Sequence, residues 1–448
     1  MDWTEIGNES VDLFRGLLRL DTTNPPGNEE LAVEYLAESL AADGLDPWMI
    51  DSAPGRTNLV VRLPATVDEP VGGPLLLAGH TDVVPADASK WRQPPFSAAE
   101  ADGCIWGRGA VDMKNMVAMS VMVAKLLARE GGVRKRDLIV ACVADEEEGC
   151  SYGSKFLVDE HPDRVRAEFA LGEVGGFSLH VGQTTYFPVM VAEKGQAHLR
   201  LRARGSSGHA SMPRRDNAIV ALSRALERIG TKRLPYHLVP TMERFITTLA
   251  ETQKLPGKLV LPRLLNARLA EVLIDNVLPE EQARNFAALL HNTVSPTVMH
   301  AGDKRNVIPG EATCDLDGRT LPGFSAVDLV REVRDVIDDD SIAVEVHSET
   351  PAVEMADPDT GLYHTIRRVV GRHDPNAVVT PYMIPGYTDG QYFSRLGTKF
   401  YGCSPLRLPR DSGLNFSEMF HGVDERVPRD GYIWGQQVLY DIVRDFLS

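Results

Sequence analysis

Short apolar runs alternate with helical stretches in the first 150 residues of the chain. Three runs, Thr57–Leu63, Leu75–Ala78 and Leu138–Val143, resemble strands, and the stretch Asn115–Arg129 between the last two is rich in Ala, Met, Val and Leu. Strands that alternate with helices predict an α/β sheet with parallel strands. Further helices are expected at Val11–Leu20, Glu29–Ala42 and Gly431–Leu447.

The pattern changes after Val191, where a strand, a helix, a strand, a helix and a strand are predicted in turn. This order is typical of a compact α+β unit. Residues 232–295 look like an insertion in it, and the last hundred residues return to α/β character. We therefore predict one α/β domain, residues 1–194 and 351–448, interrupted by a smaller domain at 195–350. The five elements are His198–Arg204, Asn217–Ile229, Glu311–Arg319, Ala326–Ile337 and Ile342–His347.

Composition excludes several classes of partner. The net charge of −16, from 47 basic and 63 acidic residues, argues against nucleic acid, which needs a basic face. No apolar run is long enough to span a bilayer, and the start MDWTEIGNES has neither a basic segment nor an apolar core, so no signal peptide is expected. The five scattered cysteines form no CxxC pair and suit reduced thiols. A cytoplasmic location is expected.

Residues suited to metal binding follow one of the apolar runs. The run Leu75–Ala78 leads into Gly79, His80, Thr81 and Asp82. Ligands of parallel α/β sheets bind just beyond the carboxyl ends of the strands. A carboxylate that accepts the second ring N–H commonly supports a metal-bound imidazole, so His80 suits a ligand and Asp82 its neighbour. A histidine hydrogen-bonded within the fold, or at the surface, is the alternative.

Acidic residues recur at comparable places. Asp112 stands just before a helix, where an N-cap is the alternative role. The run Asp145–Glu148 follows the strand Leu138–Val143, and like charges packed there are costly unless a cation neutralises them. Neighbouring carboxylates also allow one to bind metal while another serves as a base. A solvated charge run is the alternative.

Two more segments complete a set of His, Asp and Glu side chains. An apolar run from Phe169 ends in Glu173, and His421 begins the segment HGVDER near the C-terminus. Together with His80, Asp112 and one glutamate of the acidic run, they offer mixed imidazole and carboxylate ligands. Such a set suits zinc, with cobalt or manganese as alternatives.

Nine segments, taken in order, resemble one family. The ordered set is similar to the co-catalytic zinc hydrolases that include aminoacylase-1, carboxypeptidase G, acetylornithine deacetylase and succinyl-diaminopimelate desuccinylase. The resemblance implies a zinc-exopeptidase-like catalytic domain, with a mixed sheet flanked by helices, and an inserted α+β (ferredoxin-like) lid and dimerisation domain. The segments are GHTDVVP, WxxPPF from Trp91 to Phe96, GRGAVDMK, ADEEEG, Gly172-Glu173, GHASMP, NVIP, DGRTLPG and HGVDERV.

The resemblance also implies a role for each residue of the site. His80, Asp112 and Glu173 hold one zinc ion, and Asp112, Glu147 and His421 hold the other, with Asp112 bridging. Asp82 orients His80, and Glu146 is the general base. The extra acid Glu148 leaves this register open by one place, although Gly149 favours Glu146 as the base. The family often has a non-proline cis peptide after the bridging aspartate, here Asp112–Met113.

Three residues of the inserted domain receive roles in the same way. His209 reaches the active site of a dimer partner and steadies the oxyanion, so a homodimer through the inserted domain is expected. Asn306 and Arg319 match positions that hold the carboxylate of the substrate, a task suited to the planar fork of arginine. The alternative roles, taken without the resemblance, are a hairpin or strand-end histidine for His209 and a surface ion pair for Arg319.

The implied reaction is metal-dependent hydrolysis of an amide bond in a small substrate with a free carboxylate. In the family, the position of Glu173 tends to be Glu in deacylases and carboxypeptidases and Asp in dipeptidases and aminopeptidases. This favours an N-acyl amino acid deacylase, with a dipeptidase or carboxypeptidase as the alternative. A non-catalytic metal-binding protein would lack a ligand or the base, whereas every expected position is filled. The acyl group, the amino acid, the metal and the role of residues 232–295 stay open.

Overall fold

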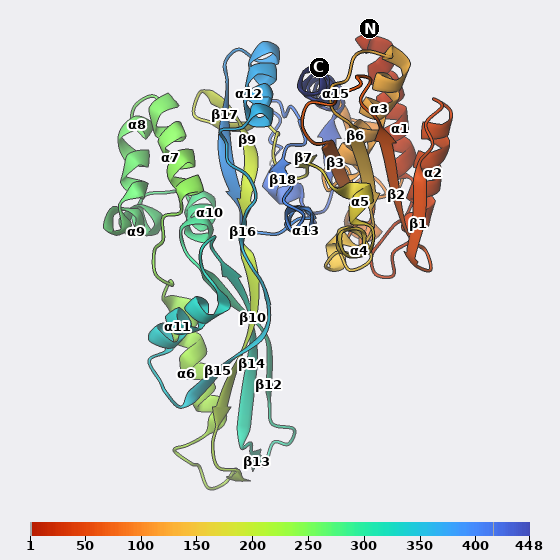
Figure 1. Cartoon of the computed structure of the whole chain (residues 1–448). Coiled ribbons are helices and arrows are strands. Elements are labelled where there is room, and N and C mark those ends of the chain that lie inside the picture. The colour runs from red at the N-terminus through yellow and green to blue at the C-terminus, as the bar shows by residue number, and fades with distance from the viewer. Residues whose placement is uncertain (1, 415) are drawn as a thin grey trace. The chain divides into compact units, whose positions relative to one another are not determined.

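The computed structural model describes residues 2–414 and 416–448. The chain divides into two compact units (Figure 1). The first unit comprises Met1–Val191, Met355–Tyr382 and Thr388–Ser448, and the second comprises Ala192–Glu354 and Met383–Tyr387. The short segment 383–387 groups with the second unit, whereas the sequence boundaries put it in the catalytic domain.

The first unit is built on a mixed sheet whose central strands are parallel. β6 (Leu138–Val143), β3 (Leu75–His80), β7 (Phe169–Gly172) and β18 (Lys399–Gly402) lie next to one another in this order and run in the same direction. Antiparallel strands flank them on both sides. The predicted mixed sheet flanked by helices is therefore confirmed. The flanking strands are β2 (Arg56–Leu63) and β1 (Trp48–Ala53) beyond β6, and β9 (Thr184–Glu193), with β8 (Leu179–Val181) and β17 (Ala377–Ile384), beyond β18.

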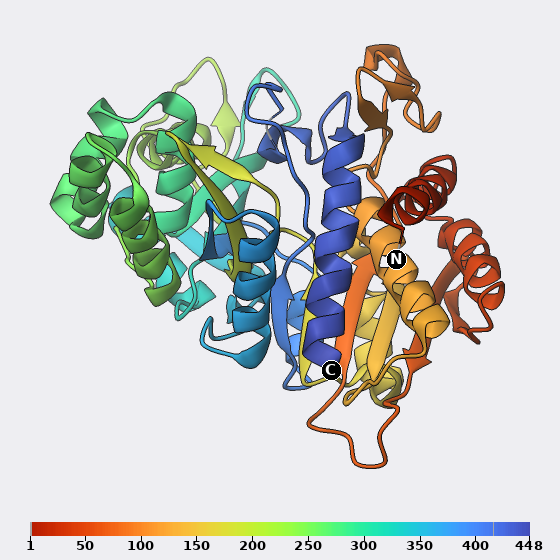
Figure 2. The ribbon, with the colours of Figure 1, turned by 90° about the horizontal axis from the view of Figure 1, so that it is seen from above.

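Long helices cover the sheet of this unit. α3 (Lys114–Glu130) is buried over nearly its whole length, as its content of Ala, Met, Val and Leu requires, and it ends at Gly131 in the left-handed conformation. α15 (Arg429–Leu447) lies beside α3 and contacts α1 (Trp3–Leu18) and α12 (Gly361–His373) (Figure 2). α2 (Glu29–Ala41) packs on β2. The shorter helices of this unit are α4 (Ser154–Glu160), α5 (Pro162–Val165), α13 (Gly390–Ser394) and α14 (Phe416–Met419).

The boundaries predicted in this unit agree with the structure except at the first helix. The strand Leu138–Val143 is found with these bounds, and the strands at the other two predicted runs extend one or two residues beyond the prediction at one end. The sequence predicts a first helix from Val11, but this helix begins at Trp3, because the Asp2 side chain caps it and Trp3 and Ile6 add to its core-facing side. Apolar periodicity alone places its start two turns late.

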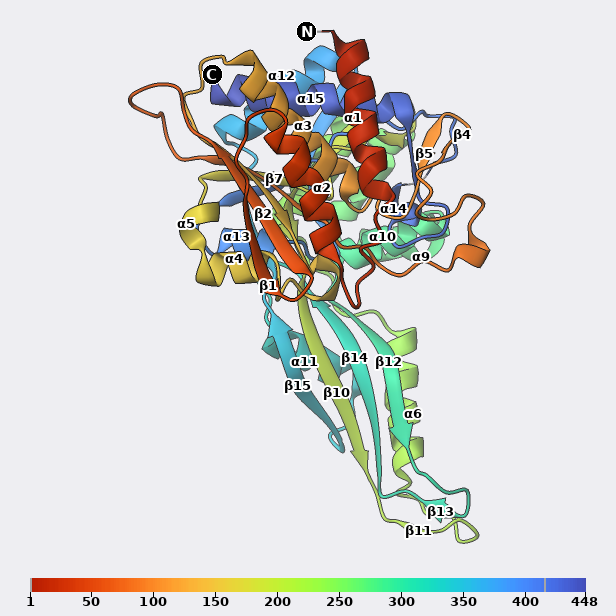
Figure 3. The same cartoon turned by 90° about the vertical axis from the view of Figure 1, so that its right-hand side faces the viewer.

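The second unit contains a four-stranded antiparallel sheet with the strand order β12-β14-β10-β15 (Figure 3). Helices α6 (Ala218–Thr231) and α11 (Ala326–Ile337) share an apolar core with the sheet. The chain order, β10, α6, β12, β14, α11, β15, gives the connectivity of a ferredoxin-like unit. The strands are β10 (Gly195–Arg204), β12 (Thr293–Ala301), β14 (Glu311–Thr320) and β15 (Ile342–Thr350).

Residues 232–295, the predicted insertion within the second unit, are mostly helical. The elements are α7 (Pro240–Thr252), α8 (Gly257–Val260), a 3₁₀ helix at Leu261–Leu265, α9 (Ala267–Asn276) and α10 (Glu280–Leu290). Sequence patterns miss β12, which overlaps the end of this insertion, because β12 is an edge strand that exposes most of its residues and contains Pro296. None of the helices in the described part of the chain combines the length and apolar character needed to cross a membrane.

Candidate metal centre

The carboxyl ends of the parallel strands bring the predicted metal ligands together. His80 is the last residue of β3, Glu147 lies in the turn after β6, and Glu173 directly follows β7. Asp112 comes just before α3, whose N-cap is Met113 and not Asp112, so the capping role does not apply. His421 enters from the loop before β19 (Arg426–Pro428), a strand paired with β5 (Cys104–Trp106) and through it with β4 (Glu100–Ala101).

These side chains form two groups of three that share Asp112. His80, Asp112 and Glu173 are the first group, and Asp112, Glu147 and His421 are the second; within each group the ligand atoms lie within 4.8 Å of one another. Asp112 offers one oxygen to each group: its Oδ1 is 3.1 Å from His80 Nε2, and its Oδ2 is 3.2 Å from His421 Nε2. Asp112 is thus placed to bridge two ions.

The spacing of the ligand atoms fits metal ions. His80 Nε2 is 3.7 Å from Glu173 Oε2, and His421 Nε2 is 3.0 Å from Glu147 Oε2. Two atoms that each lie about 2.0–2.2 Å from one tetrahedral ion are roughly 3.3–3.6 Å apart. The separations in both groups lie around this range. The peptide bond between Asp112 and Met113 is cis, as the resemblance implied.

The burial and negative charge of these carboxylates also favour bound cations. Asp112, Glu146 and Glu173 are each less than one-tenth exposed, and burial raises the pKa of Glu173 to about 8. Burial, together with the nearby Glu173, also raises the pKa of Glu146. Glu147 Oε1 is buried without a hydrogen-bond partner among the described residues. Several carboxylates buried this close together stay anionic only when positive charge lies beside them. The residues of the two groups therefore fit two divalent cations.

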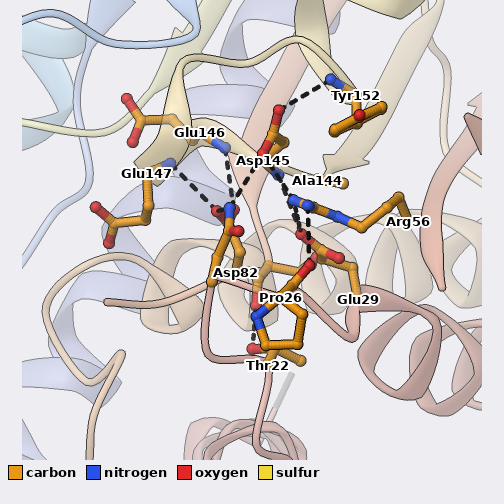
Figure 4. Close-up of polar contacts among 12 residues, drawn as sticks. Thr22, Pro26, Glu29, Arg56, Asp82, Ala144, Asp145, Glu146, Glu147 and Tyr152 are labelled. Atoms are coloured by element: carbon orange, nitrogen blue, oxygen red, sulfur yellow. Dashed lines mark hydrogen bonds and ion pairs between the residues drawn. The ribbon is translucent and has the colours of Figure 1, made fainter. Parts of the chain in front are cut away.

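Asp82 connects the two groups through its backbone and its side chain. Its carbonyl oxygen is 3.0 Å from His80 Nδ1, closer than its carboxylate Oδ1 at 3.4 Å. The carboxylate accepts the backbone N–H groups of Glu146 at 3.1 Å and Glu147 at 3.2 Å (Figure 4). Asp82 therefore supports the His80 ring mainly through its carbonyl and fixes the turn that carries both glutamates.

The three glutamates of the turn Glu146–Glu148 differ in their surroundings. Glu147 belongs to the second ligand group, and Glu148 is exposed. Glu146 is buried, belongs to neither group, and brings its Oε2 to 4.0 Å from His80 Nε2. The run thus supplies one candidate ligand, one buried carboxylate beside the candidate ligands, and one solvated side chain.

Sequence reasoning assigns no role to two buried carboxylates of this unit, Glu425 and Asp389, although Glu425 lies in the segment HGVDERV. Glu425 accepts the backbone N–H groups of Gly109, Val111 and Asp112 and pairs with Arg108 at 2.8 Å. It therefore anchors the loop that presents Asp112. Asp389 precedes α13, and burial raises its pKa to about 6. Within HGVDERV the histidine draws attention as a ligand, and no local pattern marks the role of Glu425.

The three site residues predicted in the second unit lie at two ends of its sheet. His209, in β11 (Gly208–His209), is exposed and pairs with β13 (Val307–Ile308), which follows Asn306 (Figure 3). Arg319 is near the other end of β14, about 26 Å along the strand from Glu311 at ~3.3 Å per residue. Arg319 forms a two-bond pair with Asp317, the ion pair considered as its alternative role.

This arrangement can support amide hydrolysis. Mixed imidazole and carboxylate ligands around a bridging carboxylate suit a pair of divalent ions, and Glu146 beside them is placed as a proton acceptor. Within one copy, Asn306 and Arg319 stand too far apart along the sheet to hold a single small carboxylate.

Comparison with known proteins relates the chain to hydrolases of amide bonds. It is 29% identical over 385 residues to a "Probable carboxypeptidase S-like 2" of Dictyostelium discoideum, covering 83% of this chain and 71% of the relative. It is 27% identical over 385 residues to the human "N-fatty-acyl-amino acid synthase/hydrolase PM20D1", covering 83% and 74%. A "Probable succinyl-diaminopimelate desuccinylase" of Staphylococcus epidermidis is 25% identical over 448 residues, covering 98% of each chain.

Solved structures share the fold over the whole length. A metallo-carboxypeptidase from Sulfolobus solfataricus aligns with a TM-score of 0.69 at 16% identity, covering 98% of this chain and 99% of that one. Human carnosine dipeptidase 1 aligns with a TM-score of 0.66 at 16% identity, covering 99% and 98%. A Bacillus subtilis protein described as a dinuclear metal binding peptidase aligns with a TM-score of 0.61 at 12% identity, covering 99% of each chain.

The profile of Peptidase family M20/M25/M40 matches residues 76–445, a range that contains all five of the converging ligands and both Asp82 and Glu146. The match covers far more than half of the chain. The structure provides a buried group of imidazole and carboxylate side chains at the carboxyl ends of the parallel strands, and the named relatives hydrolyse amide or peptide bonds. The chain belongs to Peptidase family M20/M25/M40 and is a hydrolase of amide or peptide bonds.

Proposed function

We propose that the protein removes the acyl group from N-acyl amino acids, using two divalent metal ions held by His80, Asp112 and Glu173 and by Asp112, Glu147 and His421. The observation that carries the proposal is the pair of ligand groups that share Asp112, with Glu146 beside them. Zinc suits these ligands, and cobalt or manganese would suit them as well. Bound ions would lower the pKa of a water and polarise the carbonyl of the substrate.

The protein's own groups supply the proton transfers. Glu146 accepts a proton from the attacking water and donates it to the leaving amine, and its place beside the ligand groups suits it for both transfers. Asp82 holds the backbone of Glu146 while the carboxylate exchanges its proton. These positions support the roles proposed for Glu146 and Asp82.

Glu173 favours a deacylase over a dipeptidase, on the family tendency described above. The human relative is named for N-fatty-acyl amino acids and the staphylococcal one for a succinylated amino acid, and both names support an N-acyl substrate. The dipeptidase alternative is supported by the fold shared with human carnosine dipeptidase 1. Both substrate classes carry a free carboxylate.

The deciding experiment follows the release of free amine from a panel of substrates. The zinc-loaded protein is incubated with N-acetyl, N-succinyl and N-lauroyl amino acids and with dipeptides. We expect cleavage of at least one N-acyl series with kcat/KM at least about tenfold above that of any dipeptide, the effect of ~1.4 kcal/mol of selective binding. Preferential cleavage of dipeptides would replace the proposal by the peptidase alternative, and binding of zinc without any cleavage would favour a non-catalytic protein.

We further propose that the protein acts as a homodimer in which the second unit of one copy completes the site of the other. Asn306 and Arg319 lie at opposite ends of one sheet, so the two together reach a single substrate carboxylate only if they come from different copies. His209 lies at the Asn306 end and would stabilise the oxyanion from the partner copy. Arg319 would pair with the carboxylate in place of Asp317.

Mixed dimers test this arrangement. Variants Glu146→Gln and His209→Ala are each expected to be nearly inactive. When equal amounts are dissociated and reassembled, half of the dimers contain both variants, and one of their two sites has an intact Glu146 and an intact His209. About a quarter of the wild-type activity should then return, because exchange between identical interfaces is statistical. Mixtures that show only the sum of the two separate activities would contradict a role for His209 in the partner site.

A further inference from the structure

A buried ion cluster lies behind the turn that carries Glu146 and Glu147, outside both ligand groups. Arg56, the first residue of β2, is 7% exposed, and its Nη2 lies 2.7 Å from Glu29 Oε1 and 2.8 Å from Asp145 Oδ1. Its Nη1 donates to the carbonyl of Pro26 at 3.1 Å. We call Asn24, Glu29, Arg56 and Asp145 the Arg56 cluster. All four are buried, so their polar groups bond to one another and to nearby protein groups in place of water.

Both carboxylate oxygens of Asp145 accept hydrogen bonds. Its Oδ1 accepts hydrogen bonds from Arg56 and from Asn24 Nδ2 at 3.1 Å, and its Oδ2 accepts the backbone N–H of Tyr152 at 3.1 Å. Its own backbone N–H donates to Glu29 Oε1 at 3.2 Å. With φ at 67°, Asp145 is in the left-handed region, which Asp tolerates better than most residues and which surrounding contacts must hold in place.

The conformation of Asp145 sets the direction of the next two residues. The chain turns there so that the backbone N–H groups of Glu146 and Glu147 point at the carboxylate of Asp82. Figure 4 shows the side chains of both glutamates extending to one side, while Arg56 and Glu29 lie on the other side of Asp82 and Asp145. The side that carries the reacting groups is therefore separate from the side that holds the turn.

Asn24 joins the two carboxylates at the centre of this arrangement. Its Nδ2 donates to Asp82 Oδ2 at 2.8 Å as well as to Asp145 Oδ1, and its backbone N–H donates to the carbonyl of Val83 at 2.9 Å. Asp82 in turn lies against His80. A continuous series of hydrogen bonds and ion pairs therefore connects Arg56, through Asp145 and Asn24, to Asp82. Asp82 itself contacts both ligand groups.

We propose that the Arg56 cluster is a positioning device that sets Glu146 for proton transfer and Glu147 for the second metal position. Its members belong to neither ligand group, so they act through the turn and not on the substrate. Displacing a reacting group by about 1 Å can cost a hundredfold in rate, and partners that orient metal ligands are typically worth about 10–100-fold in affinity or activity. The proposal rests on the roles proposed above for Glu146 and Glu147.

The test uses Asp145→Asn, which keeps the shape of the side chain but removes the charge that Arg56 requires, and Arg56→Met. Metal-free protein is titrated with zinc by calorimetry, and kcat and KM are measured on the same samples. We expect about 10–100-fold weaker binding of one of two zinc ions, the other nearly unchanged, and a fall in kcat of similar size with little change in KM. Arg56→Lys, which retains charge without the planar fork, should recover part of the loss.

Arg62→Met is the matched control, because Arg62 lies on the same strand and pairs with Asp137 at 2.6 Å on a more exposed face. It should leave zinc binding and kcat unchanged. If Asp145→Asn lowers the melting temperature but binds two zinc ions with wild-type affinity and keeps its kcat, the cluster is only structural and the proposal is wrong. The zinc titration does not depend on Glu146 being the base, so failure of the proposed function and failure of this proposal can be told apart.

Discussion

Replacing Glu146 by glutamine is expected to lower kcat by about 10²–10⁴-fold, the usual contribution of a general base. Glutamine has nearly the same shape as glutamate but cannot take up a proton from water. The backbone N–H of residue 146 can still donate to Asp82, so the turn should keep its geometry. Because Glu146 belongs to neither ligand group, the variant should still bind two metal ions per chain with almost wild-type affinity.

The measurement combines kinetics with a metal count by mass spectrometry on the same sample. Glu148→Gln is the matched control, since Glu148 lies two residues away in the same turn and is exposed. It should leave kcat and metal content unchanged. If Glu148→Gln were the inactive variant and Glu146→Gln the active one, the register of the acidic run would be shifted and the assignment of the base would fall.

The sequence predicts the core of the first unit well because its strands are continuously apolar and buried. All six residues of β6 and all six of β3 are buried, so length and composition alone mark them as central strands. The acidic and imidazole residues at their carboxyl ends then stand out as polar breaks directly after apolar runs. For this reason the amino-acid sequence points to His80, Glu173 and the acidic run Asp145–Glu148 as candidates, whereas the choice of Glu147 within the run rests on the family resemblance.

Other features depend on contacts that no local pattern reveals. Glu425 meets the backbone of Asp112 across 313 residues, and Arg56 meets Asp145 across 89. In the sequence, an isolated Glu or Arg is indistinguishable from a surface residue. The edge strand β12 escapes prediction because a strand with most residues exposed lacks the alternation that marks a half-buried one. Long-range hydrogen bonding, not local propensity, decides these positions.

Asp112 carries the second large effect, because it is the one side chain that both ligand groups share. Asp112→Ala removes an oxygen from each group, so we expect the purified protein to contain fewer than one zinc ion per chain and to lose more than about 10³-fold in kcat. Glu173→Gln and His421→Ala each disturb one group only, and each should leave about one ion bound. A bridging ligand predicts this graded loss of metal, because its removal affects both ions. Two sites without a shared ligand would lose at most one ion in each variant.

The same series has a signature in thermal stability. Ions that bind only the folded state stabilise it by RT ln(1 + [L]/Kd), which is about 2.7 kcal/mol for one ion at a hundred times its Kd. Zinc should therefore raise the melting temperature of the wild type most, that of Glu173→Gln and His421→Ala less, and that of Asp112→Ala hardly at all. Asp68→Ala, at an exposed position of the same unit, should respond to zinc like the wild type. If Asp112→Ala still gained as much from zinc as the wild type, the ions would be held elsewhere, and the bridging role of Asp112 would have to be abandoned.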